Sequence, residues 1–313
     1  MIIYILSCET TENKGGIYAF ELAGNGALQK REYFPCDRPM YAVKSGKRLC
    51  VLLRQPFENN NFSGYFYVDE KLKNATQIKS TRGIVACHLC VDDDDVYTVN
   101  YLSGNIVKNG EVSSRRIGRS VHPVRQTEAH THFVGKTPDG YLAVCDLGTD
   151  TLACYNQDLT LISAEKVPDG YGIRHLVFSK DGKYIYAVNE LVPSVSVFAY
   201  NKGTAILIDT VSIKCKHEKA NGAAIRLSND GKYLYISLRE ENVICVFAVE
   251  KGNITLTQTI DCGGDNPRDF NIFGEYLLCT NEKSNTVTVM RVQDNKFVER
   301  VGELSLNAPL CVL

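Results

Sequence analysis

Apolar and polar positions alternate in short runs along most of the chain, and Gly, Asp and Asn separate the runs. A period of two is typical of β-strands with one buried face, and these three residue types are typical of turns. The segment GKYIYAVNELVPSVSVFAY, which begins at Gly182, shows this pattern most clearly. It predicts a turn, an apolar strand with a polar end, a second turn and an alternating strand. Helical periodicity is hard to find anywhere, so we predict an all-β protein.

The same unit recurs along the chain. GKYLYISLREENVICVFAV from Gly231 and GEYLLCTNEKSNTVTVMRV from Gly274 are close copies, and four weaker copies precede Gly182. One anchor residue per copy aligns at spacings of 43 to 49 residues: Tyr4, Cys50, Tyr97, Leu142, Tyr186, Tyr235 and Leu278. Repeats of this length with several short strands are typical of propeller blades. We therefore predict a seven-bladed β-propeller with four-stranded antiparallel blades.

The two ends of the chain complement each other. The final APLCVL is typical of the innermost strand of a blade, and the opening MIIYILS is typical of a second strand. Together they predict one blade built from both termini, which closes the ring and leaves no long exposed sheet edge. Because no linker or low-complexity stretch divides the sequence, we expect residues 1–313 to form a single propeller domain.

Charge and hydropathy narrow the classes of partner. The net charge is −1, so no basic excess indicates nucleic acid binding. The first apolar run is about six residues long, shorter than a signal-peptide core, and no later run reaches the roughly 20 residues of a membrane-spanning helix. We expect a cytoplasmic protein that is a monomer or weak homodimer, with neither nucleic acid nor a membrane as partner.

Ionisable side chains converge on one rim of the predicted ring. The start of each first strand and the end of the antiparallel second strand share a rim, and the first strands line the central channel. The second strands end at Cys8, Arg54, Tyr101, Asp146, Glu190, Arg239 and Glu282. The first strands begin near His88, His132, Arg174 and Arg268, with Ala223 at the matching place in the sixth copy. We interpret this rim as a candidate site, although solvated rim charges without a function are common.

These residue types suit the hydrolysis of an anionic ester or lactone. Arginines bind carboxylate or phosphate with two parallel hydrogen bonds, and they can hold a developing negative oxygen. His132 can accept a proton near neutral pH, and Glu190 is a second base that nearby arginines would keep ionised. This set requires neither a metal nor another cofactor.

Other candidate chemistry is weaker. Cys87 and Cys90, three apart on a strand, should point to opposite faces and cannot chelate one metal. The acidic run 92–95 lies in a turn without the spacing of a calcium-binding EF-hand loop. Cys8, near the rim, is interpreted as a buried strand-end residue rather than a nucleophile. We therefore predict no metal site.

Two motifs give the chain a family resemblance. GIRHLVFSKDGKYIYAVNELVPSVSVF, residues 172–198, and HPVRQTEAHTHFVGKTPDGYLAVCDLGTD, residues 122–150, are similar to segments of the lactonase family of seven-bladed propellers. NYLSGNI from Asn100 and NPRDFNI from Asn266 resemble two further family motifs. This family includes bacterial 6-phosphogluconolactonases and fungal carboxy-muconate lactonising enzymes. The resemblance covers essentially the whole chain.

The resemblance implies a catalytic set of His132, Arg174, Glu190 and Arg239, positions that the rim had already selected. Further substrate-binding candidates are His130, Arg268, Asp146, Tyr101, Arg54, Glu282 and His88. Alternation along a strand predicts that His130 shares the face of His132, and that His175 points away from the channel into its blade. The chain departs from the family pattern at Cys8, Ile173 and Ala223, near the rim, and we expect these changes to affect the substrate rather than the fold.

Three functions remain open at this point. The first is a carboxylic-ester hydrolase of carbohydrate metabolism that opens an anionic sugar lactone such as 6-phosphogluconolactone. The second is an isomerase that forms or opens a muconate-type lactone with the same residues. The third is a non-catalytic propeller that binds a ligand or a protein, because fold alone does not fix function.

Overall fold

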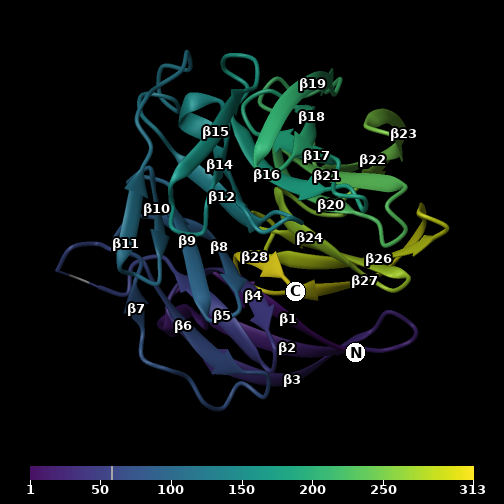
Figure 1. The fold of residues 1–313 in the computed structure, drawn as a ribbon. Helices are drawn as coiled ribbons and strands as arrows, with labels where there is room; N and C mark the ends of the chain where they lie inside the picture. Colours follow the sequence, from purple (N-terminus) through teal and green to yellow (C-terminus); the bar gives the residue numbers. More distant parts are fainter. Residues whose placement is uncertain (58) are drawn as a thin grey trace.

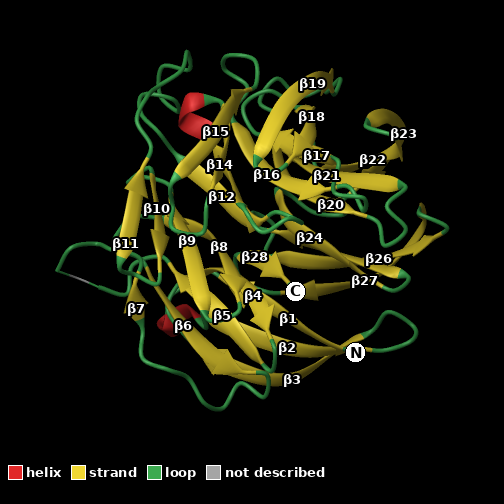
Figure 2. Cartoon of the chain, in the orientation of Figure 1, coloured by secondary structure: helices red, strands yellow, loops and turns green. Residues whose placement is uncertain are grey.

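The computed structural model describes residues 1–57 and 59–313. Seven four-stranded antiparallel sheets surround a central axis, which confirms the predicted propeller (Figures 1 and 2). The first three blades in chain order within the described residues comprise β4 (Pro39–Ser45), β5 (Arg48–Leu53), β6 (Gly64–Asp69) and β7 (Lys79–Ser80); β8 (Ala86–Asp92), β9 (Asp95–Asn100), β10 (Asn105–Lys108) and β11 (Val112–Arg115); and β12 (Thr131–Lys136), β13 (Leu142–Asp146), β14 (Thr151–Tyr155) and β15 (Leu161–Lys166).

The next three blades continue the same order. They comprise β16 (Ile173–Phe178), β17 (Tyr184–Asn189), β18 (Ser194–Asn201) and β19 (Thr204–Ser212); β20 (Asn221–Leu227), β21 (Tyr233–Arg239), β22 (Val243–Glu250) and β23 (Asn253–Asp261); and β24 (Pro267–Phe273), β25 (Tyr276–Asn281), β26 (Thr286–Gln293) and β27 (Lys296–Ser305). In residues 1–57 and 59–313, two short 3₁₀ turns, Thr11–Asn13 and Leu147–Thr149, lie between strands. In the described part of the chain, no helix is long and apolar enough to cross a membrane.

Both chain ends contribute to the seventh blade, as predicted. It consists of β28 (Pro309–Val312), β1 (Ile2–Ser7), β2 (Gly16–Leu22) and β3 (Leu28–Pro35), in that order from the channel outward. Leu6 pairs with Cys311 in the antiparallel register, and the backbone N–H of Tyr4 donates to the carbonyl of Leu313 at 2.7 Å. The ring is therefore closed by backbone hydrogen bonds between its two ends.

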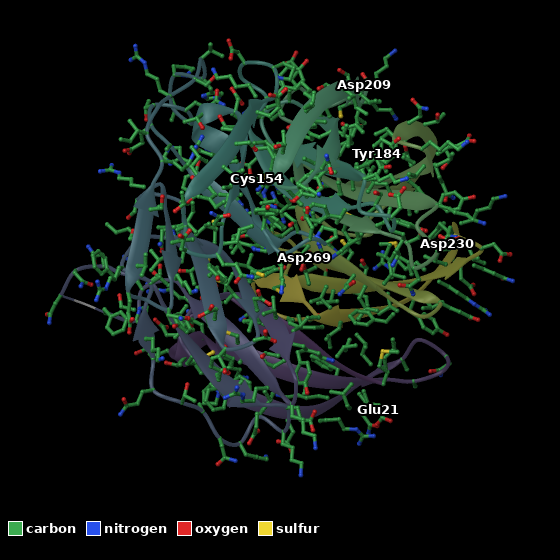
Figure 3. The ribbon with its side chains drawn as sticks, viewed as in Figure 1. Glu21, Cys154, Tyr184, Asp209, Asp230 and Asp269 are labelled. Carbon is green, nitrogen blue, oxygen red and sulfur yellow. The ribbon has the colours of Figure 1, made fainter. Side chains whose placement is uncertain are left out.

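Buried tyrosines join neighbouring blades. The hydroxyls of Tyr4, Tyr97 and Tyr235 donate to backbone carbonyls in the next blade, 60 to 66 positions further along the chain. A buried Tyr hydroxyl needs such a partner, so these three anchors of the repeat are also interblade contacts. Charged side chains such as Glu21 and Asp209 lie toward the periphery, whereas Asp269 lies near the centre of the ring (Figure 3).

The first strand of each internal blade begins with a β-bulge. The register of β4, β8, β12, β16, β20 and β24 against its second strand shifts near its first residues. The bulged positions are Met40, Cys87, His132, Arg174, Ala223 with Ala224, and Arg268. A bulge changes the direction in which the neighbouring side chains point, and bulges are frequent beside active sites. Here they set which residues face the channel.

Candidate active site

A buried carboxylate, Glu190, is the centre of the site. It directly follows β17, and its backbone N–H donates to the carbonyl of Gly172 at 2.8 Å. Its Oε2 lies 2.9 Å from Nε of Arg174 and 3.2 Å from Nη2 of Arg239. Its Oε1 accepts a hydrogen bond of 2.5 Å from Nη2 of Arg125. Three guanidinium groups from three separate segments therefore surround one carboxylate.

The two buried arginines are held by backbone carbonyls as well. Arg174 occupies the bulge of β16 and donates to the carbonyl of Ala223 at 2.6 Å, while Arg239 ends β21 and donates to that of Gly222 at 3.1 Å. Residue 222 has to be glycine, because a Cβ there would lie 2.2 Å from the carbonyl oxygen of Asn189. The close approach of β20 to the end of β17 thus fixes both arginines.

Two histidines and a tyrosine complete one side of this cluster. His132 Nε2 lies 3.9 Å from Oε2 of Glu190. The ring of Tyr101 meets His132 edge-on at 5.7 Å and stacks on His130 at 4.3 Å. His130 Nδ1 is 2.8 Å from the carbonyl of Tyr101, which holds its ring in place. His130 and His132 therefore both line the Tyr101 side of the site.

Burial and the neighbouring charges determine the protonation states of Glu190 and His132. Burial raises the pKa of Glu190, but Arg239, Arg174, His132 and Arg125 together hold it well below its usual range. Burial and the neighbouring Arg174 lower the pKa of His132 well below its usual value, against the opposing effect of Glu190. Near neutral pH, Glu190 is therefore an anion and His132 is neutral.

Positive charge is in excess around Glu190. Burial and the nearby Arg268 lower the pKa of Arg174 to about 9, which leaves it protonated at neutral pH. Arg268 also disfavours the charged forms of His132 and Arg239. Three guanidinium groups thus act on one buried carboxylate and a fourth acts on their neighbourhood, and an excess of positive charge of this kind favours an anionic ligand.

Two buried polar atoms in the cluster make no hydrogen bond to the residues that the structure describes. They are Nδ1 of His132 and Nε of Arg239. Buried polar groups normally have partners, and those without one often mark a catalytic or ligand-binding position. Both atoms belong to residues that contact Glu190, so they identify the same place in the ring.

The bulges correct one prediction about side-chain direction. His175 was predicted to point into its blade, and this is wrong. The bulge at Arg174 resets the alternation of β16, so the His175 ring lies 5.2 Å from that of His132 and 5.1 Å from that of His88. By the same shift in β8, Cys87 occupies the bulged position equivalent to Arg174. His88 lies one layer deeper, between Tyr41 at 4.2 Å and Phe133 at 4.4 Å.

Three other residues predicted for the site, Asp146, Arg54 and Glu282, lie outside the contacts that the structure describes for Glu190. Asp146 is fully buried outside the Glu190 contacts: its oxygens accept from the backbone N–H of His130 at 2.8 Å and lie 3.3 Å from Nε of Arg116. It therefore positions His130 and the preceding loop rather than facing a ligand. Arg54 is exposed, and Glu282 is half-buried near Arg239. Neither has an ion pair with Glu190 or His132 among the described residues.

Sequence reasoning missed Arg125. This residue lies in the loop between β11 and β12, which is longer than the matching connections between the other blades, so the repeat alignment could not select it. Besides Glu190, its Nε donates to the hydroxyl of Tyr101 at 3.1 Å. The Arg-Gln pair at 125–126 belonged to the segment that carried the family resemblance, and that was the signal available.

Two thiols near the rim and the metal-ligating types of side chain among the described residues are the other candidates for chemistry at this site. Burial raises the pKa of Cys8 to about 12 and that of Cys87 to about 12, so both are protonated and poorly nucleophilic at neutral pH. Within residues 1–57 and 59–313, no group of three or more His, Cys, Asp or Glu side chains is arranged to hold a metal ion. The ionisable chemistry of the site rests on Arg, His, Glu and Tyr side chains.

Comparison with known proteins agrees with this architecture. The chain belongs to the family described as "Lactonase, 7-bladed beta-propeller", whose profile matches residues 3–313. An uncharacterized protein of Lactococcus lactis is 32% identical over 191 residues, which cover 54% of this chain and 56% of that protein. An uncharacterized protein of Staphylococcus aureus strain N315 is 28% identical over 310 residues, which cover 90% of each chain.

A solved structure extends the likeness over the whole ring. The crystal structure of a proposed 6-phosphogluconolactonase from Bacteroides fragilis superposes with a TM-score of 0.89 at 26% identity. The match covers 100% of this chain and 97% of that one. The family and this likeness support a lactonase type of function and confirm the resemblance inferred from the sequence.

Proposed function

We propose that the protein is a lactonase that hydrolyses an anionic sugar lactone at the Glu190 cluster. The observation that carries the proposal is a buried carboxylate with three guanidinium groups and a neutral histidine around it, at the start of the innermost strands. The lactonase family and the proposed 6-phosphogluconolactonase from Bacteroides fragilis support lactones as the substrate class.

The residues present can carry out each step of hydrolysis. Water attacks the carbonyl carbon of the lactone and gives one proton to the pair formed by Glu190 and His132. The carbonyl oxygen becomes negative and is stabilised by a guanidinium, for which Arg174 and Arg239 are placed. The ring C–O bond then breaks, its oxygen takes up the proton, and an open-chain hydroxy acid leaves.

Rate measurements on sugar lactones test the proposal. Purified protein is assayed on glucono-1,5-lactone 6-phosphate, and the spontaneous rate is subtracted. We expect clear acceleration, and a loss of about 100-fold or more in Glu190→Gln and His132→Gln. Matched controls are Glu32→Gln and His217→Gln. Glu32 lies on the outermost strand β3, and its substitution breaks only an exposed ion pair with Lys73, while His217 is an exposed residue. Both controls should retain full activity.

Two results would contradict lactone hydrolysis. The first is a folded wild-type protein that gives no acceleration over the spontaneous reaction. The second is a Glu190→Gln variant as active as the wild type. An ultraviolet assay with carboxy-muconate separates hydrolysis from the lactonising isomerase reaction, because only the isomerase would consume that compound.

A further inference from the structure

Arg125 differs from the other two arginines of the cluster. Arg174 and Arg239 are buried side chains on strands, and each also donates to a backbone carbonyl. Arg125 comes from a loop, its side chain is 39% exposed, and its hydrogen bonds in the described structure go to Glu190 and the Tyr101 hydroxyl. Of the three, Arg125 can change its partner without leaving a buried carbonyl unsatisfied.

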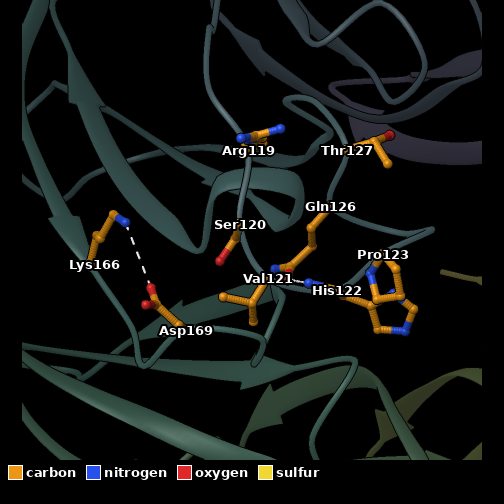
Figure 4. Close-up of a pocket in the computed structure, with 9 residues that line it drawn as sticks. All are labelled: Arg119, Ser120, Val121, His122, Pro123, Gln126, Thr127, Lys166 and Asp169. Carbon is orange, nitrogen blue, oxygen red and sulfur yellow. Dashed lines mark hydrogen bonds and ion pairs between the residues drawn. The ribbon is translucent and has the colours of Figure 1, made fainter.

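Hydrogen bonds hold the backbone of the loop around Arg125, so a change of partner requires only that the Arg125 side chain move. Gln126 donates to the carbonyl of Leu147 at 2.9 Å and to the carboxylate of Asp150 at 2.7 Å. The Ser120 hydroxyl donates to the same carboxylate at 2.5 Å, and His122 Nδ1 accepts from the backbone N–H of Arg125 at 3.1 Å. Figure 4 shows the His122–Gln126 contact beside a hollow of 520 Å³, whose lining does not include Glu190 or the residues that contact it.

The two oxygens of Glu190 have different partners. Oε2 is shared by Arg174, Arg239 and the more distant His132, whereas Oε1 accepts from Arg125. If Arg125 turns to another anion, Oε2 stays anchored and Oε1 becomes a free acceptor. A carboxylate oxygen of this kind can take a hydrogen bond, and then a proton, from an attacking water.

We propose that Arg125 binds the phosphate or carboxylate group of the substrate and in doing so releases Oε1 of Glu190 to activate water. The proposal rests on the lactonase function above and names its substrate class: lactones that carry a separate oxyanion group. Guanidinium pairs with phosphate and carboxylate by the same two parallel hydrogen bonds, so either group can make the exchange. A neutral lactone leaves Arg125 on Glu190.

The exchange also changes the acid–base properties of the site. Glu190 faces Arg125 from the loop, Arg174 from β16, Arg239 from β21 and His132 from β12, with Arg268 and Glu282 close to Arg239. Arg239, Arg174 and His132 hold the pKa of Glu190 low against the effect of burial, and Arg125 contributes to this. Loss of Arg125 to the substrate raises the pKa of Glu190 and makes it a stronger base.

Three substrates test the exchange: neutral glucono-1,5-lactone, its 6-phosphate, and glucaro-1,4-lactone, which carries a free carboxylate. In Arg125→Gln, we expect kcat/KM to fall about 100-fold for the anionic substrates, a typical loss for one charge-assisted pair. We expect it to rise for the neutral one, because the variant leaves Oε1 of Glu190 free from the start. Arg119→Gln, an exposed arginine of the same loop, is the control and should change none of them. A loss confined to the phosphate or to the carboxylate substrate identifies which group Arg125 binds.

A pH profile distinguishes binding from a merely structural role. The acid limb of kcat/KM reports the free enzyme, and that of kcat reports the substrate complex. We expect the acid limb of kcat to lie at higher pH than that of kcat/KM for an anionic lactone, and the two to coincide for the neutral one. Equal losses for all three lactones in Arg125→Gln, or coinciding limbs for an anionic lactone, would overturn the proposal.

Binding of the product 6-phosphogluconate keeps the test independent of turnover. Calorimetry should show at least about tenfold weaker binding to Arg125→Gln than to the wild type and to Arg119→Gln. If the wild type hydrolyses none of the lactones but this difference is found, the proposed function fails while the anion-binding role of Arg125 stands. If binding is equal in all three proteins, Arg125 does not bind the anion.

Discussion

Arg125 and Glu190 are 65 positions apart in the chain, yet Nη2 of the first lies 2.5 Å from Oε1 of the second. One residue lies on an exposed loop and the other is buried at the end of an inner strand. The contact joins the loop between β11 and β12 to the centre of the ring. Glu190 thus has one ion pair with a partly exposed arginine, Arg125, and two with the buried Arg174 and Arg239. The two kinds of pair should differ in their effect on stability.

Glu190→Gln should destabilise the fold more than Arg125→Gln does. Removing the Glu190 charge leaves Arg174 and Arg239 buried without a counter-ion, which costs about 3 kcal/mol in comparable pairs. Arg125 is partly solvated, so its loss should lower the free energy of unfolding by less than about 1 kcal/mol. Urea unfolding at neutral pH measures both values. Equal destabilisation by the two variants would contradict the distinction.

The buried histidines should make the protein sensitive to acid. Burial lowers the pKa of His88 to about 3, and it lowers those of His132 and His175 well below their usual range. Below about pH 6.5 the unfolded chain binds protons at these positions and the native state does not, so the free energy of unfolding falls as pH falls. This stability is complete at neutral pH and is lost progressively toward pH 5.

A substitution can isolate one of these histidines. His88→Phe suits the aromatic neighbours Tyr41 and Phe133 and removes the titrating ring. It should reduce the loss of unfolding free energy between pH 7 and pH 5 by about 1–2 kcal/mol. An unaltered pH dependence in His88→Phe would show that this ring is not held neutral.

The rate of hydrolysis should vary little with pH in the neutral range. Glu190 and His132 both have pKa values well below their usual range, so both are unprotonated in the free enzyme. We expect kcat/KM to be flat between about pH 5.5 and pH 8. A steep fall in kcat/KM between about pH 7 and pH 6, as an ordinary histidine base gives, would contradict these low pKa values.

Gly222 should be intolerant of a methyl group. A Cβ at this position would lie 2.2 Å from the carbonyl oxygen of Asn189, and a shift of the backbone would move the carbonyl that holds Arg239. We expect Gly222→Ala to lose about 2 kcal/mol or more of unfolding free energy, and to lose activity as well. Gly24→Ala is the matched control, because nothing lies within 4 Å of its Cβ. A neutral effect at Gly222 would show that the strand ends can separate without harm.

The sequence predicted the ring, and for a physical reason it also selected four residues that the structure brings together in the candidate site. Seven aligned repeats fix which strand ends meet, and His132, Arg174, Glu190 and Arg239 lie at such ends. The same argument failed where the backbone is irregular. A bulge turns His175 toward the channel, and it puts Cys87 rather than His88 at the position equivalent to Arg174.

Loop residues were the other gap in the prediction. Arg125 lies in a connection that is longer than its counterparts between the other blades, so no periodicity could place it beside Glu190. Asp146 ends β13 as Arg239 ends β21, and Glu190 directly follows β17. The oxygens of Asp146 nevertheless accept from the backbone N–H of His130 and pair with the side chain of Arg116. Register alone does not show whether a strand-end carboxylate faces the channel or a neighbouring loop.

A crystal structure with bound 6-phosphogluconate, the product of the proposed reaction, tests the site most directly. We predict the ligand beside Glu190, its phosphate paired with Arg125 in place of Oε1, and its other oxygens within hydrogen-bond distance of His132, Arg174 or Arg239. Binding in the hollow beside Arg119 and Lys166, with the Arg125–Glu190 contact intact, would contradict the assignment.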